Sequence, residues 1–399
     1  MNFDHFIDRY HTASLKWDGL NPLYGAHDLL PLWVADMDFR APSEVIQALH
    51  DRVEHGIFGY QTVQEEQDQA IIDWWRKRHD FAIEREWIVY APGVVPSLSI
   101  AVQEFTDMTD AIIIQPPVYP PFTKVVKGNG RRVAHNPLRH DQGGYRIDFD
   151  DLEQCLKIGA KMLILCNPHN PVGRVFDHAE LEQIGSLCAH YGTMVVSDEI
   201  HGDLVYAPNR HIPFASVRED FLQFSVTCAA PSKTFNIAGL HASYTIIPNP
   251  TLRKTFSHAL DRLALRSQNV LSSTAMLAAY RYGGAWLDQL LPYLQENLEF
   301  LQKELQTRIP EITMELPEGT YLAWLDCRKL GLQGVQLKQF IIEKAKLALN
   351  DGATFGLGGD GFMRVNTACT RQTLAQAINQ LETAVIELRN EGYDILHEL

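Results

Sequence analysis

A lysine at the end of an apolar segment is the first residue whose type and position could support chemistry. Lys233 lies in the loop APSKTFN, residues 230–236, directly after the strand-like run 224–228. An ammonium group beside a buried strand is costly unless its charge is lowered or used. Its amine is suited to forming a Schiff base with a carbonyl group. Considered alone, such a segment more often holds a solvated loop lysine, so the chemistry depends on what surrounds it.

An anion site is expected at a second strand end. Residues 91–97, APGVVPS, follow an apolar run and begin a helical pattern, so the backbone N–H groups of Val94 and Val95 are available to an anion. Gly93 would allow the tight turn that this arrangement needs. Ser232, the residue before the lysine, could add a hydroxyl. The alternative is a plain strand-to-helix turn.

Three further side chains lie near strand ends, where they could contact a planar ligand. Tyr119 offers an aromatic face that can stack on a ring. Asp198 could keep a ring nitrogen protonated, and His201 could hydrogen-bond an oxygen on the same ring. A metal site on Asp198 and His201 would need a third and a fourth ligand, and neither is apparent. Each residue taken singly could also be structural.

An amide and a guanidinium complete the set. Asn170 lies in NPHNPVG, residues 167–173, where its amide could reach an oxygen of the ring, although the segment could also be a structural turn. Arg364 lies between apolar neighbours in residues 361–366, and a carboxylate is its best partner. If a substrate supplies that carboxylate, the substrate is an α-amino acid. Otherwise Arg364 forms an internal ion pair.

Together these parts match the needs of pyridoxal 5′-phosphate (PLP), which combines an aldehyde, a phosphate and a pyridine ring that acts as an electron sink.

One glycine-rich loop matches a motif for a different ligand, a dinucleotide, but lacks the structural context of that motif. The loop GLGGDG, residues 356–361, matches the GxGxxG dinucleotide fingerprint, but that fingerprint needs a strand before it and a helix after it, whereas here a strand is expected to follow. We interpret it as a loop that permits close backbone approach.

The elements that must position these residues alternate between apolar runs and helical stretches. Strands are expected at residues 87–90, 111–115, 161–166, 193–197, 224–228 and 243–247, with helices at 96–105 and 178–190. Apolar strands separated by helices indicate an α/β fold with a mostly parallel sheet covered on both faces. Residues 269–307 are almost wholly helical, with a break near 282–284. The C-terminal part predicts strand 321–326, helix 336–347, strand 362–366 and helix 371–390, an α+β pattern.

Length and composition restrict the class of protein. The 399 residues are expected to form a large domain at 48–288 and a small one from 1–47 and 289–399. The formal charge of −14 argues against nucleic acid and anionic membranes as partners. No apolar segment approaches the ~18 residues of a membrane span, and no signal peptide is expected. Six cysteines without a CxxC motif are expected to be reduced core thiols, which predicts a cytoplasmic protein.

The chain resembles the fold-type I PLP enzymes of the class I/II aminotransferase superfamily, and most closely their cystathionine β-lyase branch of the MalY/PatB type. The resemblance implies a large domain with a mostly parallel seven-stranded sheet and a smaller α+β domain. It also implies a homodimer with active sites at the subunit interface, in which Tyr60 reaches the phosphate of the neighbouring subunit. The motifs that carry it span nearly the whole chain: WVADMDF (33–39), GY (59–60), PVY (117–119), PHNPVGRV (168–175), SDEIH (197–201), APSKTFNIAG (230–239) and EGTY (318–321).

The resemblance assigns a role to five of the residues above. Lys233 would form the Schiff base, Asp198 would contact the ring nitrogen, and Asn170 would lie near the phenolic oxygen. Tyr119 would stack on the ring, and Arg364 would hold the substrate α-carboxylate. The substrate side-chain pocket has four candidate lining residues, each of which could instead pack in the core: Trp33, Ala35, Met37 and Tyr321.

Two positions depart from the superfamily's pattern. His241 stands eight residues after the lysine, where many transaminases of the superfamily have an arginine that grips the phosphate. This difference favours the lyase branch. Pro120 stands where some lyases of the branch carry a second tyrosine, so no role of that tyrosine transfers to this chain.

The expected reaction is α,β-elimination of L-cystathionine or a related cysteine thioether to a thiol, pyruvate and ammonia, with Lys233 as the general base at Cα. A thiolate is a far better leaving group than hydroxide, which points to thioethers as substrates. An aminotransferase, which passes the amino group to a 2-oxo acid, is the alternative. A protein that keeps the PLP fold but acts only by binding a partner is a third possibility, which the intact set of site residues disfavours.

Overall fold

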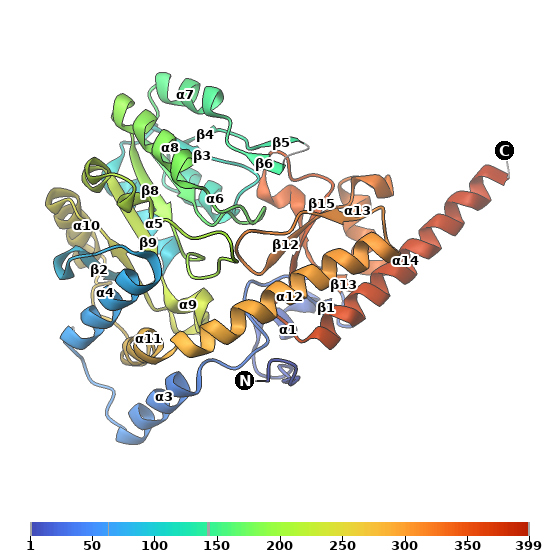
Figure 1. The fold of residues 1–399 in the computed structure, drawn as a ribbon, viewed down its shortest axis with the longest axis horizontal. Helices are drawn as coiled ribbons and strands as arrows, with labels where there is room; N and C mark the ends of the chain where they lie inside the picture. The colour runs from blue at the N-terminus through green and yellow to red at the C-terminus, as the bar shows by residue number, and fades with distance from the viewer. Residues whose placement is uncertain (1, 63, 142–143, 398–399) are drawn as a thin grey trace.

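A seven-stranded sheet forms the centre of the larger part of the molecule (Figure 1). The computed structural model describes residues 2–62, 64–141 and 144–397. The strand order is β2-β10-β9-β8-β7-β3-β4; the strands from β9 to β4 are parallel, and β10 is antiparallel to both of its neighbours. This confirms the expected mostly parallel sheet. The bounds are Ile88–Ala91 (β2), Ala111–Ile114 (β3), Arg132–His135 (β4), Met162–Cys166 (β7), Met194–Asp198 (β8), Ser225–Ala229 (β9) and Ser243–Ile246 (β10).

Six of these seven strands lie within one residue of the ranges expected from the sequence. They were recognisable because both faces of a central parallel strand are buried, which requires an almost continuous apolar run. The seventh, β4, was missed. It lies at the edge of the sheet, its terminal residues Arg132 and His135 are exposed, and only two small apolar residues separate them. An edge strand of this kind leaves no apolar signature.

Alternate residues of the strands face two different layers of helices, as the two-residue period of a strand requires. On one face, Ile112, Ile164 and Val196 belong to a core shared with α5 (Val94–Phe105), α6 (Pro121–Gly128) and α10 (Pro250–Arg262). On the other face, Ile113 and Leu163 belong to a core shared with α7 (Phe149–Lys157) and α8 (His178–Tyr191). Asp198 has the same parity as Val196, so its side chain lies on the α5 face.

The helices begin where the sequence supplies caps. Asp177 and Glu180 form a capping box at the start of α8, and Asn249 caps the first turn of α10. Asn269 caps α11 (Val270–Tyr282), which is followed after Gly283 by the 25-residue helix α12 (Gly284–Arg308). The expected helical stretch and its break near residue 283 are therefore confirmed.

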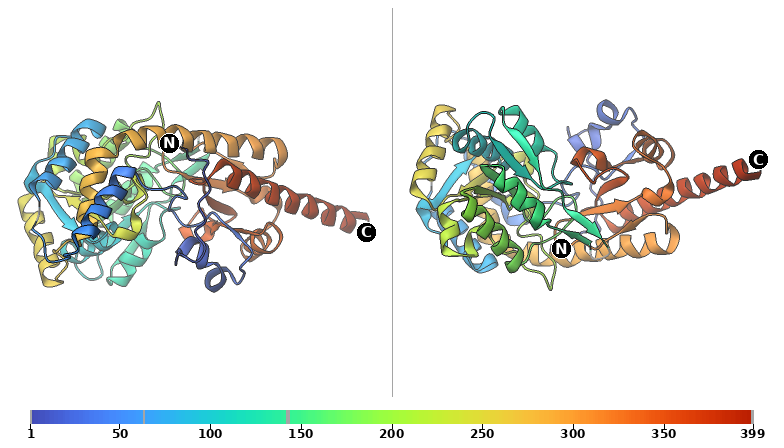
Figure 2. Two further views of the ribbon diagram at one scale, coloured as in Figure 1. Left: turned by 90° about the horizontal axis from the view of Figure 1, so that it is seen from below. Right: turned by 90° about the horizontal axis from the view of Figure 1, so that it is seen from above.

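A second, smaller sheet follows α12. It is four-stranded and antiparallel, with the order β11-β12-β15-β14, and the C-terminal helix α14 (Arg371–His397) extends away from the body (Figures 1 and 2). Helix α12 packs against α11, α14 and β11, so it runs from the large sheet to the small one. The bounds are Thr313–Met314 (β11), Leu322–Asp326 (β12), Asn350–Asp351 (β14) and Phe362–Asn366 (β15).

The expected helix 336–347 is shorter than predicted. Helix α13 (Val335–Gln339) continues as one π-helical turn, Phe340–Lys344, and then ends. Leu347 belongs instead to β13 (Leu347–Ala348), which pairs in parallel with β1 (Leu30–Pro31) near the N-terminus. An apolar pattern cannot separate the end of a helix from a buried strand that follows it within three residues.

The domain boundaries near residues 47 and 288 stay a prediction. Both positions lie inside helices, namely α3 (Ser43–His55) and α12. All six cysteines are buried and unpaired, as expected. Over the described residues, no helix is both long enough and apolar enough to cross a membrane. The loop 356–361 precedes β15, which confirms that the fingerprint there was a decoy; a Cβ on Gly359 would clash with the Gly352 carbonyl oxygen.

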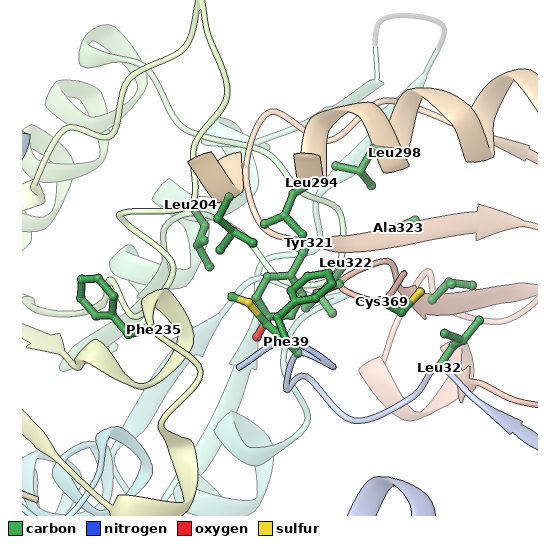
Figure 3. Close-up of a cluster of buried hydrophobic side chains, with 14 of the residues drawn as sticks. Leu32, Phe39, Leu204, Phe235, Leu294, Leu298, Tyr321, Leu322, Ala323 and Cys369 are labelled. Atoms are coloured by element: carbon green, nitrogen blue, oxygen red, sulfur yellow. The ribbon is translucent and has the colours of Figure 1, made fainter. Parts of the chain in front are cut away.

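One apolar core joins the two parts of the molecule. Figure 3 shows Leu204, from the loop after β8, beside Leu294 of α12, close to Tyr321 and Leu322 where β12 begins. Phe235, from the loop after β9, belongs to the same core. All of these side chains are buried. The loops that follow β8 and β9 are thereby packed directly on the smaller part.

Asn236 ties the segment 33–39 to the loop that carries Lys233. Its Oδ1 accepts from the Met37 N–H at 2.9 Å, and its Nδ2 donates to the carbonyls of Met37 and Phe39 at 2.9 and 2.8 Å. The residue adopts a left-handed backbone conformation, with φ at 56°. Asparagine tolerates this conformation better than most residues do.

We expect Asn236→Ala to lower the free energy of unfolding by about 2–3 kcal/mol, because it leaves three backbone groups without a partner. The matched control is Asn21→Ala, on an exposed position of α2 (Leu20–Tyr24), which should change stability by less than about 0.5 kcal/mol. Urea unfolding followed by circular dichroism measures both. Equal stabilities of the two variants would contradict this role for Asn236.

Candidate active site

Lys233 lies in the four-residue helix α9 (Pro231–Thr234), which follows β9 at the carboxyl edge of the sheet. Its Nζ donates a hydrogen bond to the carbonyl oxygen of Ala35 at 2.5 Å. Burial, with the charge of Arg364, lowers the pKa of Lys233 to about 8, while Asp36 and Asp198 act in the opposite direction. The lysine is therefore half-buried among charges and bonded to the backbone, and the solvated-loop interpretation is wrong.

Asp198 is the last residue of β8, in the middle of the sheet. It is 4% exposed, and among the described residues its carboxylate accepts one hydrogen bond, from the Ile200 N–H at 3.2 Å. Burial raises the pKa of Asp198 to about 7; the Ile200 hydrogen bond and the charge of Lys233 act against this rise. A carboxylate with so few donors around it gains from any ligand that brings a positive N–H group.

Arg364 lies on β15 and is 5% exposed. Its Nη1 donates to Asn170 Oδ1 at 3.0 Å, and its Nη2 donates to the Trp33 carbonyl at 3.0 Å and to Asn350 Oδ1 at 2.6 Å. All three acceptors are neutral, and no carboxylate of the described residues lies within ion-pair distance of this guanidinium. Its Nε is buried without a partner, and burial lowers the pKa of Arg364 to about 10. The internal ion pair that was the alternative for Arg364 is thus not present.

His201 and Tyr119 lie close to the same charges. His201 is buried, and its Nδ1 has no hydrogen-bond partner in the part of the chain that the structure describes. Burial, with the charges of Lys233 and Arg364, lowers the pKa of His201 to about 3. Its imidazole is therefore neutral at physiological pH. Tyr119 is half-buried; burial and the nearby charge of Asp198 raise its pKa. Over the described residues, no cluster of acidic, histidine or cysteine side chains suits a metal ion.

The expected anion site is present as a helix start. Helix α5 begins at Val94, two residues earlier than expected, and its first hydrogen bond runs from the Ser97 N–H to the Gly93 carbonyl at 3.1 Å. The N–H groups of Val94 and Val95 therefore precede the helical hydrogen bonds. Gly93 is extended, with φ at 169°, so the tight turn expected there is not the reason for a glycine.

His241, which stands where many transaminases of the superfamily have an arginine, lies beside the start of α5. A cavity of about 240 Å³ is lined by His241, Ala91 and Pro92, among others. The histidine itself is exposed and adopts a left-handed conformation, with φ at 53°. Ser232 is half-buried in α9.

The four candidate lining residues differ in what they contribute. The Ala35 carbonyl accepts hydrogen bonds from Lys233 Nζ and from the Tyr321 hydroxyl, the latter at 3.0 Å. Ala35 and Tyr321 therefore lie beside the lysine. The Trp33 carbonyl holds Arg364. Met37 is 1% exposed and packs in the core.

Sequence reasoning missed three residues that hold this site together. Asn350 is a neutral partner of Arg364, and Asn366 Nδ2 donates to the carbonyls of Val34 and Asp36 at 2.6 Å each. Arg9 pairs with Asp36. No pattern marks these residues: Asn366 acts on a segment more than 300 positions away, and Asn350 and Arg9 bind partners 14 and 27 positions away that no helix or strand period connects to them.

The residues present fit PLP. Among the described residues, Asp198 has no cationic donor and the buried His201 Nδ1 has no partner. Helix α5, whose first-turn N–H groups are available, packs on the same face of the sheet as Asp198. A pyridinium nitrogen, a phenolic oxygen and a phosphate are groups that would satisfy these three features.

Comparison with known proteins gives the same answer. The family model for aminotransferase class I and II matches residues 27–381. The chain belongs to this family. It is 46% identical over 386 residues to cystathionine beta-lyase PatB of Bacillus subtilis, which covers 96% of this chain and 100% of PatB.

Two solved structures are similar over nearly their whole length. A PLP-bound putative aminotransferase from Clostridium difficile 630 has a TM-score of 0.95 and 41% identity, covering 96% of this chain and 99% of that one. A PLP-bound C-S lyase from Staphylococcus hominis has a TM-score of 0.91 and 32% identity, covering 97% and 98%. The chain is thus a PLP-dependent enzyme of fold type I, and its relatives place it with the carbon–sulfur β-lyases.

The raised pKa of Asp198 makes the stability of the cofactor-free chain depend on pH. A carboxyl whose pKa is higher in the folded state stabilises the fold at low pH and loses that contribution as the pH rises toward 7. An asparagine at this position would be neutral throughout. We expect the stability of Asp198→Asn relative to the wild type to be about 2–3 kcal/mol more favourable at pH 8 than at pH 5.

Urea unfolding of the cofactor-free protein at the two pH values measures this difference. Asp150→Asn, at an exposed position of α7, is the control and should show no such change. If the difference in unfolding free energy between Asp198→Asn and the wild type were the same at pH 5 and pH 8, Asp198 would be ionised in the folded chain over this range.

Proposed function

We propose that this chain catalyses the α,β-elimination of L-cystathionine or a related cysteine thioether, releasing a thiol, pyruvate and ammonia. The environment of Arg364 is the observation that supports an amino acid as substrate. Its guanidinium is buried and held by three neutral acceptors, and its charge acts on Lys233. A buried cation without an anionic partner is a site for a carboxylate. The α-carboxylate of an amino acid would place Cα near the lysine amine.

Lys233 is the proposed base. Its lowered pKa allows a substantial neutral fraction slightly above physiological pH, and a neutral amine can accept the Cα proton. The electron pair of the broken C–H bond then expels the sulfur from Cβ as a thiolate. Water converts the unsaturated amino acid that remains into pyruvate and ammonia.

The other residues hold and orient the cofactor. PLP, when bound, supplies an aldehyde for the lysine and a ring that accepts electrons from Cα. Asp198 would keep the ring nitrogen protonated, and Tyr119 would cover one face of the ring. His201 and Asn170 are the proposed partners of the phenolic oxygen.

The phosphate would bind at the start of α5. The Val94 and Val95 N–H groups and the Ser232 hydroxyl are the proposed donors, and the helix dipole favours an anion there. Ala35 and Tyr321 are the proposed neighbours of the substrate, since both lie beside the lysine amine.

We expect purified protein with PLP and L-cystathionine to release pyruvate through many turnovers without any 2-oxo acid. Lys233→Ala should lower this rate by at least roughly 1000-fold, because both the covalent anchor and the base are lost. The matched control is Lys124→Ala on the exposed side of α6, which should retain full activity. Full activity of Lys233→Ala would refute the assignment.

An aminotransferase is the second candidate, because the Clostridium difficile neighbour carries that description. Both reactions begin with removal of the Cα proton, so the same residues would serve. The assay separates them: a transaminase would release no pyruvate from cystathionine, but would become active once 2-oxoglutarate and an amino donor are supplied together.

A homodimer is part of this proposal. Tyr60 is fully exposed, and the preceding Ile57 and Phe58 are 67% and 55% exposed. Apolar residues exposed together indicate a contact surface. In the proposed dimer, the hydroxyl of Tyr60 binds the phosphate of PLP in the neighbouring subunit. The six unpaired cysteines suit a reducing compartment, so we propose that the enzyme works in the cytoplasm.

We expect light scattering to give twice the chain mass. Tyr60→Phe should keep the dimer but weaken PLP binding roughly 10-fold, since one hydrogen bond to a charged group is lost. The comparison variant is Tyr282→Phe, another exposed tyrosine. Unchanged PLP affinity in Tyr60→Phe would remove the residue from the phosphate site.

A further inference from the structure

We propose that Arg9, from the N-terminal segment, is a positioning residue for catalysis: it fixes and neutralises Asp36, and through Asp36 it sets the charge that surrounds Lys233. The proposal rests on the function of Lys233 as base. It adds a residue that touches neither the lysine nor any substrate.

Arg9 binds Asp36 with both arms of its guanidinium. Its Nη1 donates to Asp36 Oδ1 at 2.9 Å, and its Nη2 donates to Asp36 Oδ2 at 2.8 Å. The Nη1 also donates to Asp38 Oδ1 at 2.7 Å and to the Met37 carbonyl at 3.2 Å. The fork geometry makes this a directional contact that lysine cannot reproduce.

The segment that Arg9 holds is the one that contacts the catalytic lysine. Ala35, whose carbonyl accepts from Lys233 Nζ at 2.5 Å, directly precedes Asp36. The Asp36 side chain is 22% exposed, so its charge is only partly screened by water. Its carboxylate raises the pKa of Lys233, against the effects of burial and of Arg364.

Charged and titratable groups face Lys233 from several elements. Asp198 at the end of β8 also favours the protonated amine, whereas Arg364 on β15 opposes it. His201 lies within electrostatic reach of the lysine and is neutral because burial lowers its pKa to about 3. The Tyr321 hydroxyl shares the Ala35 carbonyl with the lysine, and burial raises its pKa.

Asp36 itself has two further neighbours. The buried Lys16 Nζ lies 3.8 Å from Asp36 Oδ1, but its short contact is with Asp38 Oδ2 at 2.7 Å. Tyr321 also feels the Asp36 charge. Arg9 is thus the group that engages both Asp36 oxygens, and its removal would leave the carboxylate largely unneutralised.

Substitutions of Arg9 and of Asp36 should move the pKa of Lys233 in opposite directions. Arg9→Met exposes the negative charge of Asp36 to Lys233 and should raise the pKa of the lysine. Asp36→Asn removes the negative charge, keeps the size of the side chain and should lower that pKa. A purely structural role of the pair would disturb the segment in both variants in the same way.

The decisive measurement is the pKa of Lys233 in the full-length chain after PLP has been dialysed out. Trace labelling with acetic anhydride between pH 6 and pH 10, followed by mass spectrometry of the Lys233 peptide, reports the fraction of neutral amine. We expect an upward move of roughly 0.5–1 pH unit in Arg9→Met and a downward move of similar size in Asp36→Asn. In the PLP-loaded enzyme, the acid limb of the pH profile of pyruvate release should move in the same two directions.

Three further variants complete the test. Arg9→Lys keeps the positive charge, so the pKa of Lys233 should lie close to its wild-type value. The free energy of unfolding should recover less, relative to Arg9→Met, because lysine cannot form the two-armed contact. The double variant Arg9→Met/Asp36→Asn should lie near the wild type. Arg389→Met, which breaks a two-armed pair with Glu311 far from the site, should leave the lysine unchanged. Shifts of the same sign in Arg9→Met and Asp36→Asn, or no shift in either, would overturn the proposal. Because the labelling needs no turnover, it stands even if the chain fails to release pyruvate.

Discussion

The structure depends on bringing three charged side chains together, two from the carboxyl edge of the large sheet and one from β15 of the small sheet, without contact ion pairs between them. The charges of Asp198 and Arg364 both act on Lys233 through space. In direct contact, however, Lys233 meets a carbonyl, Asp198 meets an N–H, and Arg364 meets two amide oxygens and a carbonyl. Burial disfavours every charged form, which brings the pKa of Lys233 down to about 8 and that of Asp198 up to about 7. Such a site is costly for the fold and gains from a ligand that is itself both anionic and cationic.

The cost is tolerable because the surrounding backbone is fixed by other means. Asp198 ends β8 and Lys233 follows β9, and both strands belong to a sheet buried on both faces by helices. The apolar core around Tyr321 joins this sheet to the smaller one, so Arg364 is brought to the lysine by packing that does not involve the charges. The charged groups are therefore positioned by the fold and do not have to stabilise it.

The N-terminal segment holds the loop at residues 36–38, a role that no pattern in its sequence indicates. Arg9 binds the carboxylates of Asp36 and Asp38, and Lys16 and Trp17 hydrogen-bond that of Asp38. Asn236 and Asn366 hydrogen-bond the backbone of the same segment. Residues from both ends of the chain and from its middle therefore converge on one short loop. The β1–β13 pairing adds a backbone link between residues 30–31 and 347–348. A change in the first 20 residues can reach the lysine through this loop without touching the site.

The central strands, the break near Gly283 and the site residues at strand ends were predictable, because buried strands need apolar runs and polar residues directly after them stand out. The edge strand β4 and the pairing of Leu347 with Leu30 were not, since neither leaves an apolar run of its own. Sequence alone determined which side chains could do chemistry: a lysine, a carboxylate and a guanidinium, each beside a buried strand. Only the tertiary structure decided that Arg364 has no carboxylate partner among the described residues, that Met37 faces the core, and that Arg9 binds Asp36. The physical reason is that pairing and desolvation depend on residues that the fold brings together from 14 to 331 positions apart, which a local pattern cannot register.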